Sequence, residues 1–179
     1  MKIAILISGH LRRFEEIIDN FKENLIDPLT TKYDYDIYIH TWDTNIIETD
    51  TFDTNKFINY DKKIDYKYIN GLFSKENIKI KKITIENQKE IFHLLNVDSY
   101  LNTNSKERSL HNKFEKEYVE KIVKSLFFQY YGHHKLLNSI ENIDNYDFII
   151  KTRPDMFYEK FDTIILNHDI FFPDSHQNG

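Results

Sequence analysis

The residues best suited to chemistry are Arg153 and Asp155, which flank Pro154 directly after an apolar run. Residues 146–152 have the apolar, β-branched pattern of a buried strand. Pro154 lacks a backbone N–H and disfavours helix at the residue before it, so the carboxylate of Asp155 should lie at the strand's C-terminal edge. A carboxylate beside a guanidinium could hold a divalent cation together with phosphate oxygens. The simpler interpretation is a surface ion pair between the two side chains.

A second cluster, Ser8-Gly9-His10-Leu11-Arg12-Arg13, follows another apolar run. Gly9 would allow close backbone approach to a phosphate, the following helix would offer unpaired N–H groups, and the arginines would add positive charge. The alternative is an ordinary strand-to-helix turn with two solvated arginines. Neither GxGxxG nor GxxxxGK[ST] occurs, which disfavours a dinucleotide site and a Walker-type site.

A third cluster is His40-Thr41-Trp42-Asp43. Asp43 could contact a ribose or a base, and Trp42 could stack on a ligand or pack in the core. His40 could ligate a metal, although a lone strand histidine is more often simply hydrogen bonded. Lys135, in a long helical segment, could reach a diphosphate or could be solvated. Adjacent helical histidines point about 100° apart, so His133-His134 does not suggest a zinc site.

Strand and helix patterns alternate along the chain and would bring these clusters together. Strands are predicted over residues 2–8, 35–41, 78–85 and 146–152, and helices over 11–29, 87–95 and 113–143, the last with a break at Gly132. Residues 44–77 suggest a polar insertion with a short helix or two. This alternation predicts one α/β domain, a Rossmann-like, mostly parallel open sheet with helices on both faces. Ligands bind such sheets at the C-terminal ends of the strands.

Composition narrows the function classes. The 179 residues suit a single domain, and the net charge of −5 gives no basic surface for nucleic acid, which we do not expect as a partner. The absence of cysteine excludes disulfides and thiolate metal sites. The apolar run at residues 3–7 is too short to span a membrane and lacks a signal-peptide layout, so we expect a soluble, cytoplasmic protein.

Four motifs together carry a family resemblance: ISGHLRRF, DIYIHTWD, SLFFQYYGHHKLLNSIE and YDFIIKTRPDMFY. The chain resembles, from Lys2 to about Tyr158, a group of glycosyltransferases of the A-type (GT-A) fold from bacterial surface-polysaccharide loci and large DNA viruses. The resemblance implies a nucleotide-sugar-binding half that ends in a motif analogous to DXD. In that motif a carboxylate binds Mn²⁺ or Mg²⁺, which bridges the phosphates of the donor.

Carried over by position, Asp155 would be the metal and diphosphate residue, with Arg153 beside it. The loop from Ser8 through Gly9 and His10 to Arg12 would line the nucleotide, together with Asp43. The sequence departs from DXD because Arg153 occupies the first acidic position. An arginine there could partly replace the cation.

The implied reaction transfers a sugar from a nucleoside-diphosphate sugar to a hydroxyl of a glycan or other acceptor, as in polysaccharide biosynthesis, in the cytoplasm (the host's, if viral). An acceptor-binding region normally follows the Asp motif, but only 21 residues follow Tyr158, with Asp174 or His176 as candidate bases. We therefore expect a minimal transferase or one lacking its C-terminal acceptor portion. The alternatives are a non-catalytic nucleotide-binding or interaction domain, and a flavodoxin-like domain with no nucleotide.

Overall fold

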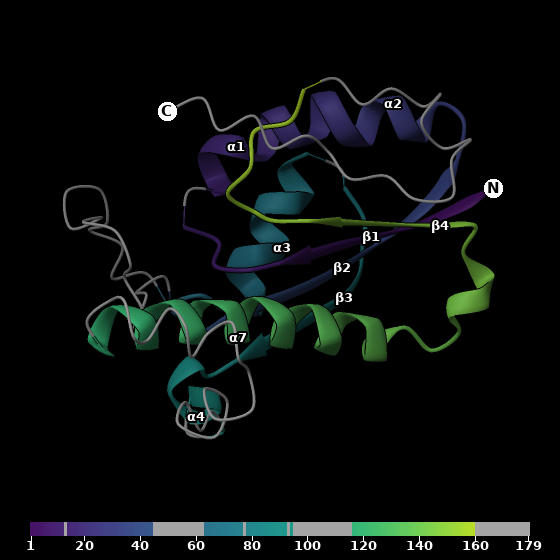
Figure 1. The fold of residues 1–179 in the computed structure, drawn as a ribbon. Helices are drawn as coiled ribbons and strands as arrows, with labels where there is room; N and C mark the ends of the chain where they lie inside the picture. Colours follow the sequence, from purple (N-terminus) through teal and green to yellow (C-terminus); the bar gives the residue numbers. More distant parts are fainter. Residues whose placement is uncertain (13, 45–62, 77, 93, 95–115, 160–179) are drawn as a thin grey trace.

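The fold is built on one open, entirely parallel sheet. The computed structural model describes residues 1–12, 14–44, 63–76, 78–92, 94 and 116–159 (Figure 1). Its four strands lie in the order β3-β2-β1-β4, with bounds β1 Lys2–Ser8, β2 Asp34–Trp42, β3 Ile80–Glu86 and β4 Phe148–Thr152. The predicted Rossmann-like α/β class is thus confirmed, and each predicted strand exists to within two residues at either end.

The central strand β1 lies between β2 and β4, and it is buried on both faces because helices pack on each side of the sheet. Its residues from Ile3 to Ile7 are at most 1% exposed, as a continuous apolar run requires. Ser8 pairs with His40 of β2, and Ile7 pairs with Thr152 of β4, so all three strands end at one edge. The strand order reverses between β1 and β4, which is the position where open α/β sheets bind ligands.

One face of the sheet is covered by a continuous helical stretch and by α3 (Tyr66–Lys75). The stretch comprises α1 (Phe14–Phe21), the π-helical segment η1 (Lys22–Ile26) and α2 (Asp27–Thr30), near the predicted 11–29. Phe14 packs against Phe73 of α3 with ring centroids 5.3 Å apart. This face holds the larger apolar core, built on the odd-numbered residues of β1 and β2.

The helix α7 (Lys116–Ser139) crosses the opposite face (Figure 1). Its Leu136 and the following Ile140 pack on Ala4, Leu6 and Tyr38 in a smaller core. The 3-10 turn η2 (Ile143–Asn145) then leads to β4, and the short α4 (Gln88–Phe92) follows β3. Among the described residues, no helix has the length and apolarity needed to cross a lipid bilayer.

The predicted break at Gly132 is wrong, because α7 continues through this residue. Gly132 lies where α7 comes closest to the sheet. A Cβ at this position would overlap Oγ of Ser8 and lie 2.9 Å from Nδ1 of His40. The glycine therefore permits a close helix-to-sheet approach. The helix ends at Ser139, earlier than the predicted residue 143.

Candidate functional site

A cavity of about 90 Å³ lies at the C-terminal edge of the sheet, where β1 and β4 diverge. Two of the predicted clusters supply most of the predicted residues that line it, and the third supplies only Trp42. The residues from the first two clusters are Ser8, Gly9, His10, Arg12, Arg153 and Asp155. The two clusters come from opposite ends of the described chain and meet because β1 and β4 are paired and parallel. Arg13 lies outside the described residues.

The turn after β1 depends on the absence of a side chain at Gly9. Its φ of +138° is in the region that favours glycine, and its N–H donates to the carbonyl of His40 at 3.2 Å. A Cβ would lie 3.2 Å from Cδ of Pro154. Gly9 therefore lets the β1 turn contact the Arg153-Pro154-Asp155 segment, and this contact helps to shape the cavity.

Arg153 and Asp155 form a bidentate ion pair on the cavity wall. Nε of Arg153 donates to Oδ1 of Asp155 at 2.9 Å, and Nη2 donates to Oδ2 at 2.7 Å. The hydrogen bonds from Arg153 to Asp155 raise the pKa of the guanidinium. The two side chains are 49% and 28% exposed, so a ligand can reach them. The ion pair thus forms part of the cavity wall, and Asp155 uses two of the five N–H donors of Arg153.

His10 is neutral and has a fixed orientation. Burial lowers its pKa to about 4, even though the hydrogen bond to the carbonyl of Thr44 opposes this shift. Because a carbonyl only accepts, Nδ1 carries the proton and donates to Thr44 at 3.1 Å. Nε2 then accepts from the side-chain amide of Gln88 at 3.1 Å. His10 consequently adds no charge to the cavity near neutral pH.

The described charged residues that line the cavity are two arginines and one carboxylate. Arg12 and Arg153 are the cations among the described lining residues, and Asp155 is the carboxylate. Both arginines keep their charge at any physiological pH. This combination favours a ligand with more than one negative charge, such as a diphosphate.

Two predicted site residues lie outside the cavity lining. Asp43 accepts a hydrogen bond from the side chain of Asn87 at 3.0 Å. Nζ of Lys135 lies 3.3 Å from Oε1 of Glu86 and 5.1 Å from the ring centre of Tyr131. Each of these side chains has a partner outside the cavity, and their predicted contacts with a diphosphate and a nucleotide stay predictions.

Glu86 joins three elements at the centre of a network that the sequence analysis missed. Its carboxylate accepts from Nε2 of His40 at 2.7 Å and from the hydroxyl of Tyr131 at 3.0 Å. Burial would raise the pKa of Glu86, but these hydrogen bonds outweigh it and hold the pKa below its ordinary value. His40 is thus hydrogen bonded. The signal in the sequence is that Glu86 directly follows the predicted strand at residues 78–85.

Five further residues line the cavity. The sequence suggests a stacking or packing role for Trp42 and no site role for the other four. The five residues are Trp42, Gln88, Ser125, Phe128 and Gln129. Trp42 is 2% exposed, and its ring centroid lies 5.0 Å from that of Phe128, so it mainly packs in the core. The other four belong to α4 and α7, and a helix pattern does not indicate which polar side chains face a strand end.

The described residues supply little for a metal on their own. No group of three or more His, Asp or Glu side chains among them could hold an ion. Asp155 could contribute one ligand after leaving Arg153, and the others would be phosphate oxygens and water. The predicted bases Asp174 and His176 lie outside the described residues.

No protein family model matches the chain, and no significantly similar protein was found among curated proteins or among solved structures. The assignment of a function therefore depends on the residues and geometry of this chain.

Proposed function

We propose that the protein is a glycosyltransferase that uses a nucleoside-diphosphate sugar as donor and a hydroxyl group as acceptor. One observation carries the proposal. The loop after β1 and the Arg153-Pro154-Asp155 segment after β4 line one positively charged cavity, where the strand order of a parallel sheet reverses. Phosphate-containing ligands bind at this position in open α/β sheets. The residues involved are also those of the GT-A resemblance.

The cavity suits the diphosphate portion of the donor. Its volume of about 90 Å³ is well below the range of roughly 300–1,000 Å³ that encloses a whole ligand. We propose that Arg12 and Arg153 bind the phosphate oxygens here, while the sugar and the nucleoside extend along the edge of the sheet. The turn at Gly9 allows the backbone to approach the phosphates closely.

The proposed reaction places negative charge on this diphosphate. The bond between the anomeric carbon and the phosphate oxygen breaks, and its electron pair leaves with the diphosphate. The acceptor oxygen forms the new bond to the anomeric carbon and gives its proton to a base. Because the sugar becomes cationic and the leaving group anionic in the transition state, two guanidinium groups held at the leaving group lower the barrier.

In this proposal the Arg153–Asp155 ion pair opens during donor binding. The diphosphate takes the two donors of Arg153 that now bind Asp155, and the carboxylate is released into the cavity. Mn²⁺ or Mg²⁺, when bound there, would neutralise further charge on the diphosphate. Asp155 is the cavity carboxylate available to hold it.

Titration with UDP-, GDP- and dTDP-sugars, with and without Mn²⁺, tests the proposal through the thermal unfolding temperature. We expect at least one donor to stabilise the protein, by about 2.7 kcal/mol at a concentration of about 100 times its Kd. Arg153→Gln should weaken this stabilisation, because one cation at the diphosphate is lost.

Asp155→Ala should abolish slow hydrolysis of the donor, measured as release of the nucleoside diphosphate. The matched control is Lys22→Gln, which removes an ion pair with Glu76 (3.6 Å) on the α1 and α3 face and should leave donor binding unchanged. If no donor stabilises the wild-type protein, the proposal is wrong.

A non-catalytic nucleotide-binding or interaction domain is the second candidate function. Two observations favour it. Asp155 is held by Arg153 in the closed ion pair, and the described lining residues include no second carboxylate that could act as a base. In that case a nucleoside diphosphate would bind as well as its sugar conjugate, Mn²⁺ would have no effect, and the donor would remain intact. If the wild-type protein releases the nucleoside diphosphate from the donor and Asp155→Ala does not, this second candidate function is excluded.

A further inference from the structure

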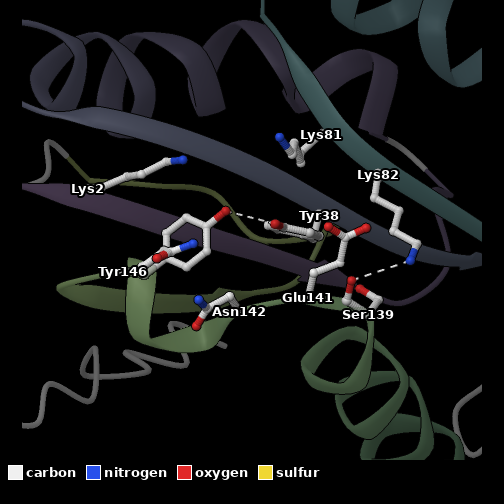
Figure 2. Close-up of a pocket in the computed structure, with 9 residues that line it drawn as sticks. Lys2, Tyr38, Lys81, Lys82, Ser139, Glu141, Asn142 and Tyr146 are labelled. Atoms are coloured by element: carbon white, nitrogen blue, oxygen red, sulfur yellow. Dashed lines mark hydrogen bonds between the residues drawn. The ribbon is translucent and has the colours of Figure 1, made fainter.

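A second and larger cavity, of about 180 Å³, lies at the opposite end of the sheet. It is bounded by the beginnings of β1 and β3 and by the chain that leads from α7 to β4 (Figure 2). It shares no lining residue with the first cavity. An inference about it is therefore independent of the proposed transferase function.

One wall of this second cavity is a fixed hydrogen-bond network with little net charge. Nζ of Lys2 lies 2.8 Å from Oδ2 of Asp36, and the hydroxyl of Tyr146 donates to the same carboxylate at 2.6 Å. Because the proton of Tyr146 is used there, the hydroxyl of Tyr38 donates to Tyr146 at 2.8 Å (Figure 2). Lys2 is thus neutralised within the wall, and Tyr38 keeps free acceptor capacity.

A second wall presents two consecutive lysines. Ile37 pairs with Ile80 and Tyr38 pairs with Lys82, so the register shift leaves Lys81 without a partner in β2. Successive strand residues normally point to opposite faces, but such an irregularity redirects a side chain. Lys81 and Lys82 consequently both line the cavity. The ammonium of Lys82 also donates to the carbonyl of Ser139 at 3.4 Å.

The side facing these lysines presents a carboxylate and amides. Glu141, Asn142 and Asn145 line the cavity from the segment after α7. Figure 2 shows Glu141 directed into the space between this segment and the sheet. Within the described part of the chain, neither Glu141 nor Lys81 has an ion-pair partner. The cavity lining thus contains a donor and an acceptor, Lys81 and Glu141, that form no ion pair with each other or with another described residue.

The charge of Lys82 is partly offset by the carbonyl of Ser139 at the negative end of α7. Lys81 and Glu141 then remain as opposite charges in the lining, which favours a ligand without net charge that carries hydroxyl groups. An anion would meet Glu141 and the negative end of the α7 dipole, whereas a cation would meet Lys81 and Lys82. Each hydroxyl of a sugar both donates and accepts a hydrogen bond, so neighbouring hydroxyls can satisfy an ammonium and a carboxylate at once. We propose that this cavity binds one neutral monosaccharide unit. Its volume is below that of sites for larger ligands, which limits it to a single ring.

Titration of the full chain with methyl glycosides of glucose, galactose and mannose tests the proposal, with amide chemical shifts as the readout. We expect at least one glycoside to shift the amide signals of Asn142, Asn145 and Lys82 in a saturable way. Glu141→Gln and Lys81→Gln should each lower the affinity about tenfold, as the loss of one hydrogen bond to a charged group does. Glu90→Gln, an exposed change on α4, and Arg153→Gln should leave it unchanged.

Inorganic phosphate is the probe for the opposite result. If phosphate binds instead of the glycosides, and Glu141→Gln tightens its binding, the cavity is an anion site and the proposal is wrong. An absence of saturable shifts with every glycoside also overturns it. Neither result depends on whether a nucleotide sugar binds at the first cavity, because Arg153→Gln affects that binding alone.

Discussion

At the scale of single residues, the charge of the first cavity is set by the surroundings of each ionisable group. His10 is held neutral by burial, with Nδ1 committed to Thr44. Arg12 and Arg153 therefore provide the positive charge, and they do so at every physiological pH. The affinity for a diphosphate should consequently not depend on the protonation of His10 near neutral pH.

The stability of the protein, in contrast, should depend on His10 at acidic pH. A histidine in the unfolded chain has a pKa near 6.5, whereas burial lowers the pKa of His10 in the folded protein to about 4. Between these values the unfolded state binds more protons, so the free energy of unfolding should decrease as the pH falls through this window. The contribution is at most about 1.4 kcal/mol per pH unit.

Urea unfolding of wild type and His10→Gln from about pH 7 to about pH 4 measures this effect. The variant should lose less stability across the window, because it lacks the titrating group. His134→Gln, on the exposed side of α7, serves as the control and should retain the wild-type slope. Identical pH profiles for wild type and His10→Gln would contradict the assignment of His10 as a buried neutral group.

Some site residues could be predicted from the sequence because parallel strands that are neighbours must end at one edge. This rule places Ser8 to Arg12 at the same edge of the sheet as Arg153 and Asp155, and the pairing of β1 with β4 then brings them together. It does not decide which partner a long side chain contacts. Lys135 contacts Glu86 and Asp43 accepts a hydrogen bond from Asn87, and neither partner could be predicted from the sequence.

At the scale of the elements, Gly132 sets how closely α7 approaches the sheet. Gly132→Ala should destabilise the protein by about 1–3 kcal/mol, because the added methyl group overlaps Ser8 and crowds His40. Gly71→Ala is the matched control. Gly71 is also helical, and a Cβ there meets no atom within 4 Å, so this change should stabilise the protein by about 0.5–1 kcal/mol.

Thermal and urea unfolding of the two glycine variants provide the measurement. Both variants replace glycine by alanine, but the free energy of unfolding should fall for Gly132→Ala and rise for Gly71→Ala. The comparison therefore separates the effect of close packing from that of helix propensity. A stabilising Gly132→Ala would show that α7 lies farther from β1 and β2 than described. The sequence could not distinguish these roles, because a glycine in a helical pattern carries the same intrinsic cost of about 1 kcal/mol in either setting.

Glu86 connects three elements through its side chain. It lies on β3 and binds His40 of β2 together with Tyr131 and Lys135 of α7. Glu86→Gln should lower the free energy of unfolding by about 1.5–3 kcal/mol, the range for hydrogen bonds to a charged group. Urea unfolding measures the change, and Glu90→Gln on α4 should have almost no effect. An equal effect of the two substitutions would contradict this role.

At the scale of the whole molecule, the class of fold could be predicted and the strand order could not. Apolar runs separated by helical periodicity indicate a parallel sheet, because parallel strands need long connections between them. The order β3-β2-β1-β4 depends on which strands pair, and no local pattern encodes that choice. The sequence analysis therefore placed the polar strand ends at one edge without showing that β1 and β4 are neighbours there.

The pairing of β1 with β4 also has a consequence for how the protein is made. Ile3 pairs with Phe148, so one edge of the first strand stays open until nearly all of the described chain has left the ribosome. Long-range parallel pairing is slow to form, because a large loop must close before any contact is gained. The nascent chain therefore carries an unpaired apolar strand edge for most of its synthesis, which is the period when aggregation or chaperone binding competes with folding.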